Sequence, residues 1–202
     1  GGSYHTLPSG DTWYTAWGAD DTFYMNVDDG LGFEDPGGKH VMLRHALCKM
    51  NGNPNESTDG FQGVNLNPGS LGNTIPNSVN TGDHGYTTGM YEVDGVIYQA
   101  RHAWNPMPNL WPPINCSITK SPDGGRNWYD HLGQKNVPLT TGSNSMFPVL
   151  PWSWINFIQY GKSGAAPAID NANKYIYITS DVFLARVPRA KITDLNKADY
   201  QY

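Results

Sequence analysis

The sequence predicts an all-β fold built from short antiparallel strands. Charged residues make up only 15% of the 202 residues and aromatic residues 12%, while 23 glycines and 15 prolines supply turns. Such a chain has enough aromatic and apolar surface for a core, which argues against disorder. No stretch longer than a turn or two has the periodicity of an amphipathic helix. Helical bundles are therefore excluded as well.

Pairs of strand-like segments around a tight turn recur along the chain. They lie at 12–17 with 22–27, at 89–93 with 96–100, and at 165–169 with 174–178. The intervening Asp-Gly and Asp/Asn clusters supply the positive φ angles that tight hairpins need. Another strand candidate follows each pair, at 41–44, 116–120 and 182–186.

A repeated four-stranded antiparallel meander is typical of a β-propeller blade. A β-sandwich is the alternative, because its hairpins look similar. We count about three blades, whereas a closed propeller needs at least four. The ring is thus expected to be incomplete, either because 1–202 is the N-terminal part of a propeller domain or because a second chain completes it. The other explanation is a missed blade in 51–85, which we interpret as a long loop rich in Asn, Gly and Pro.

One motif carries a specific structural prediction. The segment 121–128 reads Ser-Pro-Asp-Gly-Gly-Arg-Asn-Trp and matches Ser/Thr-x-Asp-x-Gly-x-x-Trp, with Ser121 at its first position. We expect Asp123 to cap backbone N–H groups of a hairpin turn, Gly125 to adopt a conformation closed to other residues, and Trp128 to pack beneath the turn.

This motif resembles the Asp box of the Asp-box β-propellers, which include sialidases and other carbohydrate-active enzymes. The resemblance implies that the box is structural and lies away from the active face, so Asp123 receives no catalytic role. The segments 15–21 with 28–30, 157–162 and 183–188 are similar to parts of secreted five-bladed propellers classed as glycoside hydrolases. Related five-bladed enzymes include arabinan-degrading furanosidases.

Several features indicate a secreted, extracellular protein. Cys48 and Cys116 are predicted to form a disulfide, with two buried free thiols as the alternative. N-glycosylation sequons begin at Asn55 and Asn115. A glycan on Asn115 would lie beside the disulfide, so these two predictions compete. The start at Gly1 without a Met indicates a processed or trimmed N-terminus.

Composition also excludes some partners. The net charge is −5 and no basic block is present, so nucleic acid is not expected as a partner. No apolar run approaches the roughly 20 residues that span a bilayer, so no membrane is expected. Asp- and Asn-rich loops suit Ca²⁺, but no ordered ligand spacing is present. We therefore assign no metal ligands and no cofactor, and Ca²⁺ is the alternative that stays open.

Strand direction sorts the polar residues. The first two strands of a blade join at the bottom face, so sites gather at the top, where the second strand ends. Turn-forming roles at the bottom are expected for Asp20, Asp21, Asp94 and Asp170. We predict catalytic roles for Asp28, Asp29, Asp83, Arg101 and His102, and substrate binding by Asp11, His84, Tyr86, Trp104, Lys162 and Asp181.

Glycoside hydrolysis is the first functional interpretation. It needs two carboxyl groups flanking the bond, and Asp28 or Asp29 with Asp83 or Asp11 would supply them. Polysaccharide is the expected partner, with Arg101 and Lys162 orienting its hydroxyls or a carboxylate. The side chains of Arg101, Lys162 and either Asp28 or Asp29 are predicted to meet in one pocket near the ring axis. Asp123 is expected to lie far from that pocket. Adjacent strand residues point to opposite faces, so at most one of Arg101 and its neighbour His102 points to the ring axis.

Two alternatives remain open. A lyase acting on a uronic-acid polymer would use Arg101 against the carboxylate and His102, His84 or Tyr86 to remove a proton. A non-catalytic carbohydrate-binding or assembly module would stack sugars on Trp104, Trp111 and Tyr86.

Overall fold

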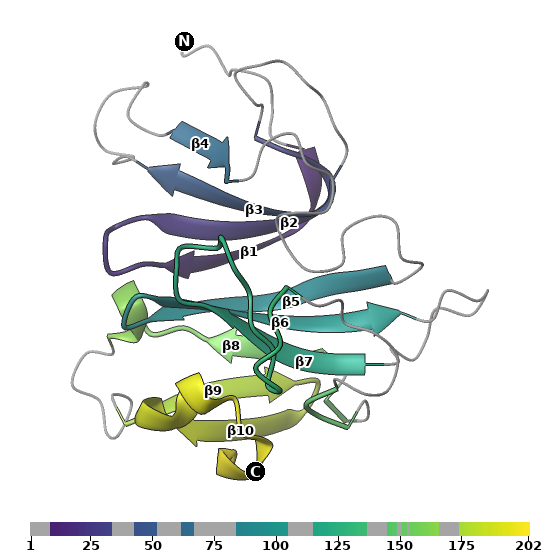
Figure 1. Ribbon diagram of the computed structural model, residues 1–202, viewed down its shortest axis with the longest axis vertical. Coiled ribbons are helices and arrows are strands. Elements are labelled where there is room, and N and C mark those ends of the chain that lie inside the picture. The colour runs from purple at the N-terminus through teal and green to yellow at the C-terminus, as the bar shows by residue number, and fades with distance from the viewer. Residues whose placement is uncertain are drawn as a thin grey trace.

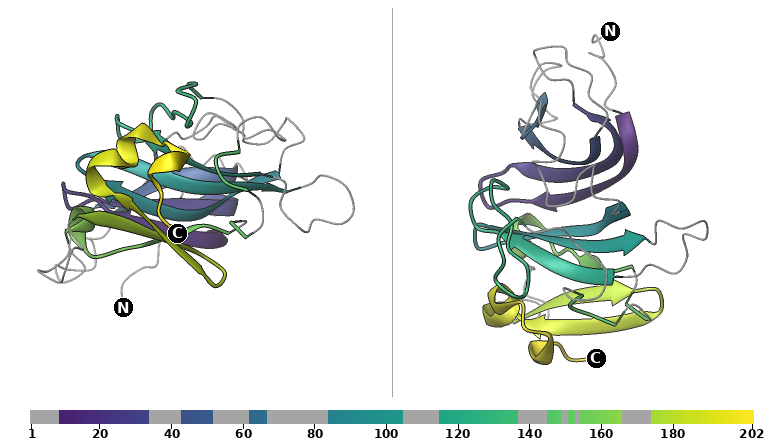
Figure 2. Two further views of the ribbon diagram at one scale, coloured as in Figure 1. Left: turned by 90° about the horizontal axis from the view of Figure 1, so that it is seen from below. Right: turned by 45° about the vertical axis from the view of Figure 1, so that its right-hand side comes forward.

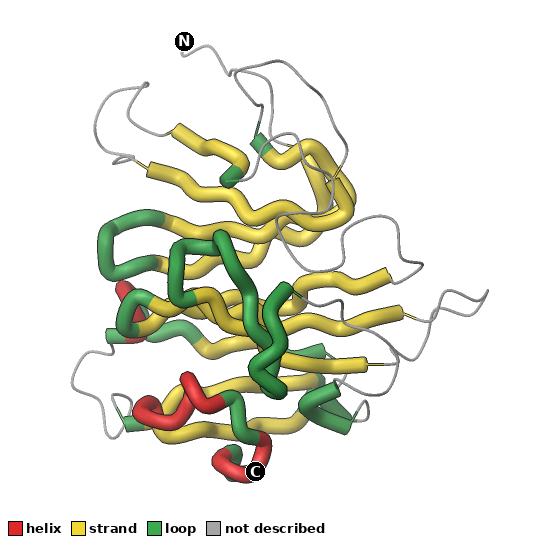
Figure 3. The backbone as a smooth tube through the Cα atoms, viewed as in Figure 1, coloured by secondary structure: helices red, strands yellow, loops and turns green. Residues whose placement is uncertain are grey.

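The computed structural model describes residues 9–33, 43–51, 62–66, 84–104, 115–136, 145–148, 151–152, 154–165 and 174–202. These residues form three antiparallel sheets, here called A, B and C, which follow one another along the long axis of the molecule (Figure 1). The right-hand view in Figure 2 shows the same order. The predicted all-β class is confirmed, because the helices among these residues are short 3-10 segments (Figure 3).

Each sheet runs up and down in sequence order. Sheet A contains β1 (Ser9–Trp17), β2 (Phe23–Gly32), β3 (Leu43–Asn51) and β4 (Gln62–Asn65). Sheet B contains β5 (His84–Val93), β6 (Val96–Trp104) and β7 (Asn115–Ser121). Sheet C contains β8 (Asn156–Ile158), β9 (Tyr175–Ser180) and β10 (Phe183–Pro188). The 3-10 segments are η1 (Lys162–Gly164), η2 (Arg189–Asp194) and η3 (Lys197–Asp199). In the described part of the chain, no helix is long and apolar enough to cross a membrane.

Sheets B and C each gain a short fourth segment. Tyr129 forms an antiparallel bridge to Lys120 at the end of β7, and Gln201 forms one to Arg186 in β10. Both bridges are closed by paired backbone hydrogen bonds of 2.8 and 2.9 Å. Each sheet therefore has a four-segment antiparallel order, with the fourth segment reduced to a bridge in B and C.

The first strands of the three sheets meet. β1 packs against β5, and β5 packs against β8. Gln159 follows β8 directly, and its side-chain amide donates to the backbone carbonyl of Thr15 in β1 and to that of Met90 in β5, the latter at 3.0 Å. One side chain thus links the first strands of sheets A and B to the end of β8.

Two apolar interfaces hold the sheets together. Between A and B, the buried side chains are Ala16, Leu47, Met90, Ile97 and Trp128. Between B and C lies a larger cluster that includes Tyr98, Ile118, Phe147, Ile155, Ile176 and Val187. Successive residues of a strand face opposite sides, so β6 directs Ile97 toward sheet A and Tyr98 toward sheet C. A strand covered on both faces is expected to be apolar throughout, as most of β6 is.

Two strand predictions need correction. The first strand of the third unit was expected at 165–169, of which 166–169 lie outside the described residues, but the strand that pairs with β9 is the earlier β8, through Phe157 and Ile178. After β8 the chain turns through η1, where Ser163 and Gly164 have φ angles of 48° and 61°. Within 51–85, the expected long loop contains β4, a short strand at the edge of sheet A.

The disulfide prediction is wrong, because Cys48 and Cys116 are both buried free thiols. Cys48 packs with Val27, and its thiol donates to the Asn65 side-chain oxygen at 3.1 Å. Cys116 lies in β7, in the cluster between sheets B and C. The two side chains are therefore in separate clusters on different sheets. Burial raises the pKa of both thiols, that of Cys48 to about 12.

Candidate functional site

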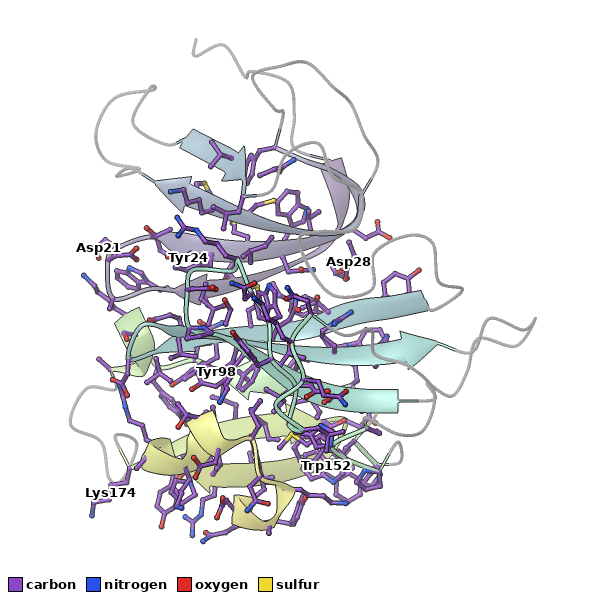
Figure 4. All side chains as sticks on the ribbon, in the orientation of Figure 1. Asp21, Tyr24, Asp28, Tyr98, Trp152 and Lys174 are labelled. Carbon is purple, nitrogen blue, oxygen red and sulfur yellow. The ribbon has the colours of Figure 1, made fainter. Side chains whose placement is uncertain are left out.

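The strands of the stacked sheets end on two opposite sides of the molecule, which we call its two ends. At the turn end lie the β1–β2 turn, the β5–β6 turn and η1, and Asp21 marks this end in Figure 4. Asp28 of β2 marks the other end, here called the Asp28 end, where β5 begins and β6 ends. The hairpin turns at 20–21 and 94–95 thus share one end, as the strand directions predict.

Asp28 is a buried carboxylate with a fixed orientation. Its side chain lies in β2 and is 1% exposed. The Thr12 hydroxyl donates to Oδ2 at 2.9 Å, and the Asn26 amide donates to Oδ1 at 2.9 Å. Because each oxygen accepts from a separate donor, the carboxylate cannot rotate without breaking one of these bonds.

A hydrogen-bond relay connects Asp28 to sheet B. Gln99 in β6 donates through its side-chain Nε2 to Asn26 Oδ1 at 2.9 Å and to Thr87 Oγ1 at 2.7 Å. Gln99 and Arg101 are two residues apart on one strand, so both side chains face sheet A. Arg101 is 0% exposed. The facing surfaces of A and B therefore bury a carboxylate and a guanidinium toward the same end.

His102 points to the opposite face of β6. Its ring packs edge-on against Trp154, with centroids 4.6 Å apart, and near Tyr86, at 6.1 Å. His102 is 0% exposed, whereas Tyr86 and Trp154 are partly exposed. Arg101 and His102 thus lie on different sides of sheet B, in line with the expected alternation.

Trp154 joins the three sheets at this end. Its backbone N–H donates to the Ser180 hydroxyl of β9 at 3.1 Å, and its ring contacts His102 of β6. The Tyr14 hydroxyl of β1 is hydrogen-bonded to the Trp154 side chain. Burial raises the pKa of Tyr14, the bond to Trp154 opposes this, and the negative charge of Asp28 raises the pKa further. Tyr14 is therefore a protonated phenol at neutral pH.

We call Asp28, Tyr14, Trp154, His102, Tyr86 and Arg101 the junction cluster. Sequence reasoning missed Tyr14 and Trp154, together with the supporting residues Thr12, Asn26, Gln99 and Thr87. The available signal was a Trp shortly before the Asn156–Ile158 strand, and it was overlooked because the third unit was expected to begin at 165. The cluster combines a carboxylate acceptor, phenol groups and an indole, which are groups that bind sugar hydroxyls and ring faces.

Lys162 does not belong to this cluster, and its predicted convergence with Asp28 and Arg101 is wrong. Its ammonium lies 2.6 Å from the Asp21 carboxylate, at the turn end. This contact holds the pKa of Asp21 below its usual value. The reason for the error is the position of β8. Lys162 follows that strand instead of preceding one, so the chain has already crossed the sheet.

The remaining predicted site residues fall into three groups. Asp11 pairs with Asp28 across β1 and β2 and is exposed, and Asp181 is exposed in the β9–β10 turn. Backbone positions near the Asp28 end are described for Asp29, His84 and Trp104, but not their side chains. Outside the described residues lie Asp83, Trp111, Asp170 and the sequon residue Asn55.

The second sequon lies at the start of β7. Asn115 pairs with Ala103 of β6, and Ser117, the sequon's third residue, is 0% exposed. Glycosylation at Asn115 remains a prediction.

The Asp-box segment forms the turn that its sequence predicts. Asp123 accepts hydrogen bonds from the Asn127 backbone at 2.8 Å and from the Ser121 hydroxyl at 2.9 Å. Burial alone would raise the pKa of Asp123, but its hydrogen bonds outweigh this effect and hold the pKa below its usual value. Gly125 has φ +90°, and Trp128 is 1% exposed in the A–B interface. Asp123 thus has a structural role.

Neither a metal centre nor a relative guides the interpretation further. Among the described ranges, no three His, Cys, Asp or Glu side chains are grouped so that they could hold a metal ion. A scan against protein-family models and a search of curated proteins find no match to this chain. The chemistry of the junction cluster is therefore the main guide to function.

Proposed function

We propose that this chain is part of a secreted β-propeller that hydrolyses glycosidic bonds, with Asp28 as the carboxylate that attacks the sugar or activates water. Sheets A, B and C would be three of its blades. Three observations support the propeller: the repeated meander order, the contact between the first strands of the sheets, and the Asp-box turn after β7. Two sheets lying face to face in a sandwich would not bring a third first strand to the same junction.

The geometry of Asp28 carries the proposed activity. A nucleophile or base must present an acceptor oxygen in a fixed direction, and Thr12 and Asn26 hold both oxygens of this carboxylate as acceptors. A separate carboxyl group must then donate the proton. Asp11 is the described candidate, because it is exposed and is the cross-strand partner of Asp28. Asp29 and Asp83 are the other candidates.

The surroundings of Asp28 suit a carbohydrate. Tyr14 and Trp154 are partly exposed, their side chains are hydrogen-bonded, and the charge of Asp28 acts on Tyr14. Aromatic rings with a polar edge bind the apolar face of a sugar while bonding its hydroxyls. The cluster therefore supplies both a reactive oxygen and a platform that would hold the ring beside it.

The placement of Arg101 favours hydrolysis over elimination. A lyase needs a cation on the substrate carboxylate and a base beside the same sugar. Arg101 faces sheet A and His102 faces sheet C, so the two cannot flank one sugar from their positions on sheet B.

The test is a comparison of wild type with Asp28→Asn on a panel of aryl glycosides and plant and bacterial polysaccharides. Released reducing ends report hydrolysis, and ultraviolet absorbance reports an unsaturated product. We expect wild-type hydrolysis and a loss on the order of 10²–10⁴-fold in the variant. Asp20→Asn is the matched control, because Asp20 lies on the β1–β2 turn at the opposite end of sheet A.

Each other outcome contradicts the proposal in its own way. Equal hydrolysis by Asp28→Asn removes Asp28 from the reaction. An absorbing product assigns a lyase. Binding of glycans without cleavage by the wild type assigns a non-catalytic module.

A further inference from the structure

We propose that Gln99 is a positioning residue that holds the Asp28 carboxylate in its reactive orientation through Asn26. The proposal rests on the role of Asp28 proposed above. It adds that Gln99, which lies on sheet B, acts through Asn26 to set the direction of the Asp28 carboxylate on sheet A.

The polarity of the relay carries this inference. An amide group has a donor end and an acceptor end of similar shape. Gln99 donates to the oxygen of Asn26, and the nitrogen of the same amide donates to Asp28 Oδ1 at 2.9 Å. The Asn26 amide is therefore held at both ends. If its oxygen turned toward Asp28, two acceptors would face each other and repel.

Gln99 is itself fixed by a second bond. Its Nε2 has two hydrogens, and the relay uses one for Asn26 and the other for the Thr87 hydroxyl at 2.7 Å. An oxygen in place of this nitrogen would face the Asn26 oxygen, which can only accept, although the Thr87 hydroxyl could still donate to it. The contact with Asn26 therefore fixes which end of the Gln99 amide points to sheet A, and the Thr87 bond holds the side chain in place.

Burial makes the relay persistent. The exposed fractions are 0% for Asn26, 0% for Gln99 and 1% for Thr87. Hydrogen bonds in such surroundings are stronger than in water, and solvent does not compete for their partners. A positional error of about 1 Å in a reacting group can cost about 10²-fold in rate, so an orienting contact of this kind matters for catalysis.

Two substitutions test the relay. Gln99→Met keeps the length of the side chain and removes both donors, and Gln99→Glu replaces the donor with a second acceptor facing Asn26. We expect kcat to fall roughly 10-fold in Gln99→Met and further in Gln99→Glu, with KM nearly unchanged, because the interaction orients a reacting group. Gln201→Glu is the matched control, since Gln201 is exposed near the end of the chain.

A double-mutant cycle distinguishes positioning from a structural role. If Gln99 acts through Asp28, Gln99→Met adds no loss of residual activity in an Asp28→Asn background. An additive loss, a change in KM alone, or a loss that follows a lowered unfolding midpoint would overturn the proposal. Full activity of Gln99→Met beside an inactive Asp28→Asn refutes the relay alone, whereas an active Asp28→Asn refutes the proposed function.

Discussion

Two neighbouring glycines of the Asp-box turn allow the cost of backbone strain to be measured apart from the cost of steric contact. Gly124 has φ +69° and Gly125 has φ +90°, a region that L side chains rarely adopt. A Cβ added at Gly124 would meet no atom within 4 Å, whereas one added at Gly125 would lie 2.0 Å from Leu47 Cδ2. Alanine at either position carries the same kind of backbone cost, but only Gly125→Ala also pushes on the core between sheets A and B.

The magnitudes follow from these two contributions. A left-handed backbone conformation costs a non-glycine residue about 1–2 kcal/mol. Overpacking a buried contact adds about 1–3 kcal/mol. We therefore expect Gly124→Ala to lower the free energy of unfolding by about 1–2 kcal/mol and Gly125→Ala by about 2–5 kcal/mol.

Urea denaturation followed by tryptophan fluorescence measures both values. Leu47→Ala opens a cavity of its own, so the double variant Leu47→Ala with Gly125→Ala is compared with Leu47→Ala alone. In that background Gly125→Ala should cost only the backbone share of about 1–2 kcal/mol, because the new methyl group occupies the space of the removed side chain. Equal losses for the two single variants would refute the reasoning. They would mean that Leu47 moves away freely and that the turn does not pack against sheet A as the structure has it.

Two further predictions concern groups whose burial shifts their pKa. In the native protein, Cys48 and Cys116 should not react with an aromatic disulfide that labels free thiols near pH 8. After denaturation, two thiols per chain should react. An intact mass lower by two hydrogens would show a disulfide and contradict this prediction. Burial raises the pKa of Tyr24 and of Tyr91 from 10.0 to about 12. The unfolded state therefore loses these protons first, so their stabilising contribution is complete below pH 10 and disappears as the pH rises through 12. Ultraviolet absorbance of tyrosinate and the free energy of unfolding, both measured between pH 10 and pH 12, check this prediction. Ionisation of all tyrosines near pH 10 in the native protein would contradict it.

Local patterns predicted most of the strands. The Asp94-Gly95 turn and its apolar flanks defined β5 and β6, because both the turn chemistry and the strand pattern depend on residues close in sequence. The Asp-box hydrogen bonds were predictable for the same reason, since Ser121, Asp123 and Asn127 lie within one turn. β8 was missed because three residues carry too little periodicity to define a strand.

The candidate site was predictable only in part. Asp28, Arg101 and His102 could be placed at one end from strand direction, and their alternation followed from the period of two. The contact of Asp28 with Thr12 lies within the β1–β2 pair of sheet A, whereas the contact of Gln99 with Asn26 joins residues 73 positions apart on two sheets. The second contact depends on how the sheets stack, which no local pattern encodes.

The predictions for the cysteines and for Lys162 failed for the same reason, because local sequence does not show which sheets lie together. Both predictions came from residue type and chain order, and both were wrong because the partner is set by the sheet on which a side chain lies. By itself, the sequence determined the all-β class, most hairpins and the internal structure of the Asp-box turn, since these arise from interactions between neighbours in the chain. Only the tertiary structure decided which faces of the sheets meet, and with them the relay from Gln99 to Asp28 and the position of Trp154, because burial and hydrogen bonding across an interface depend on packing between distant segments.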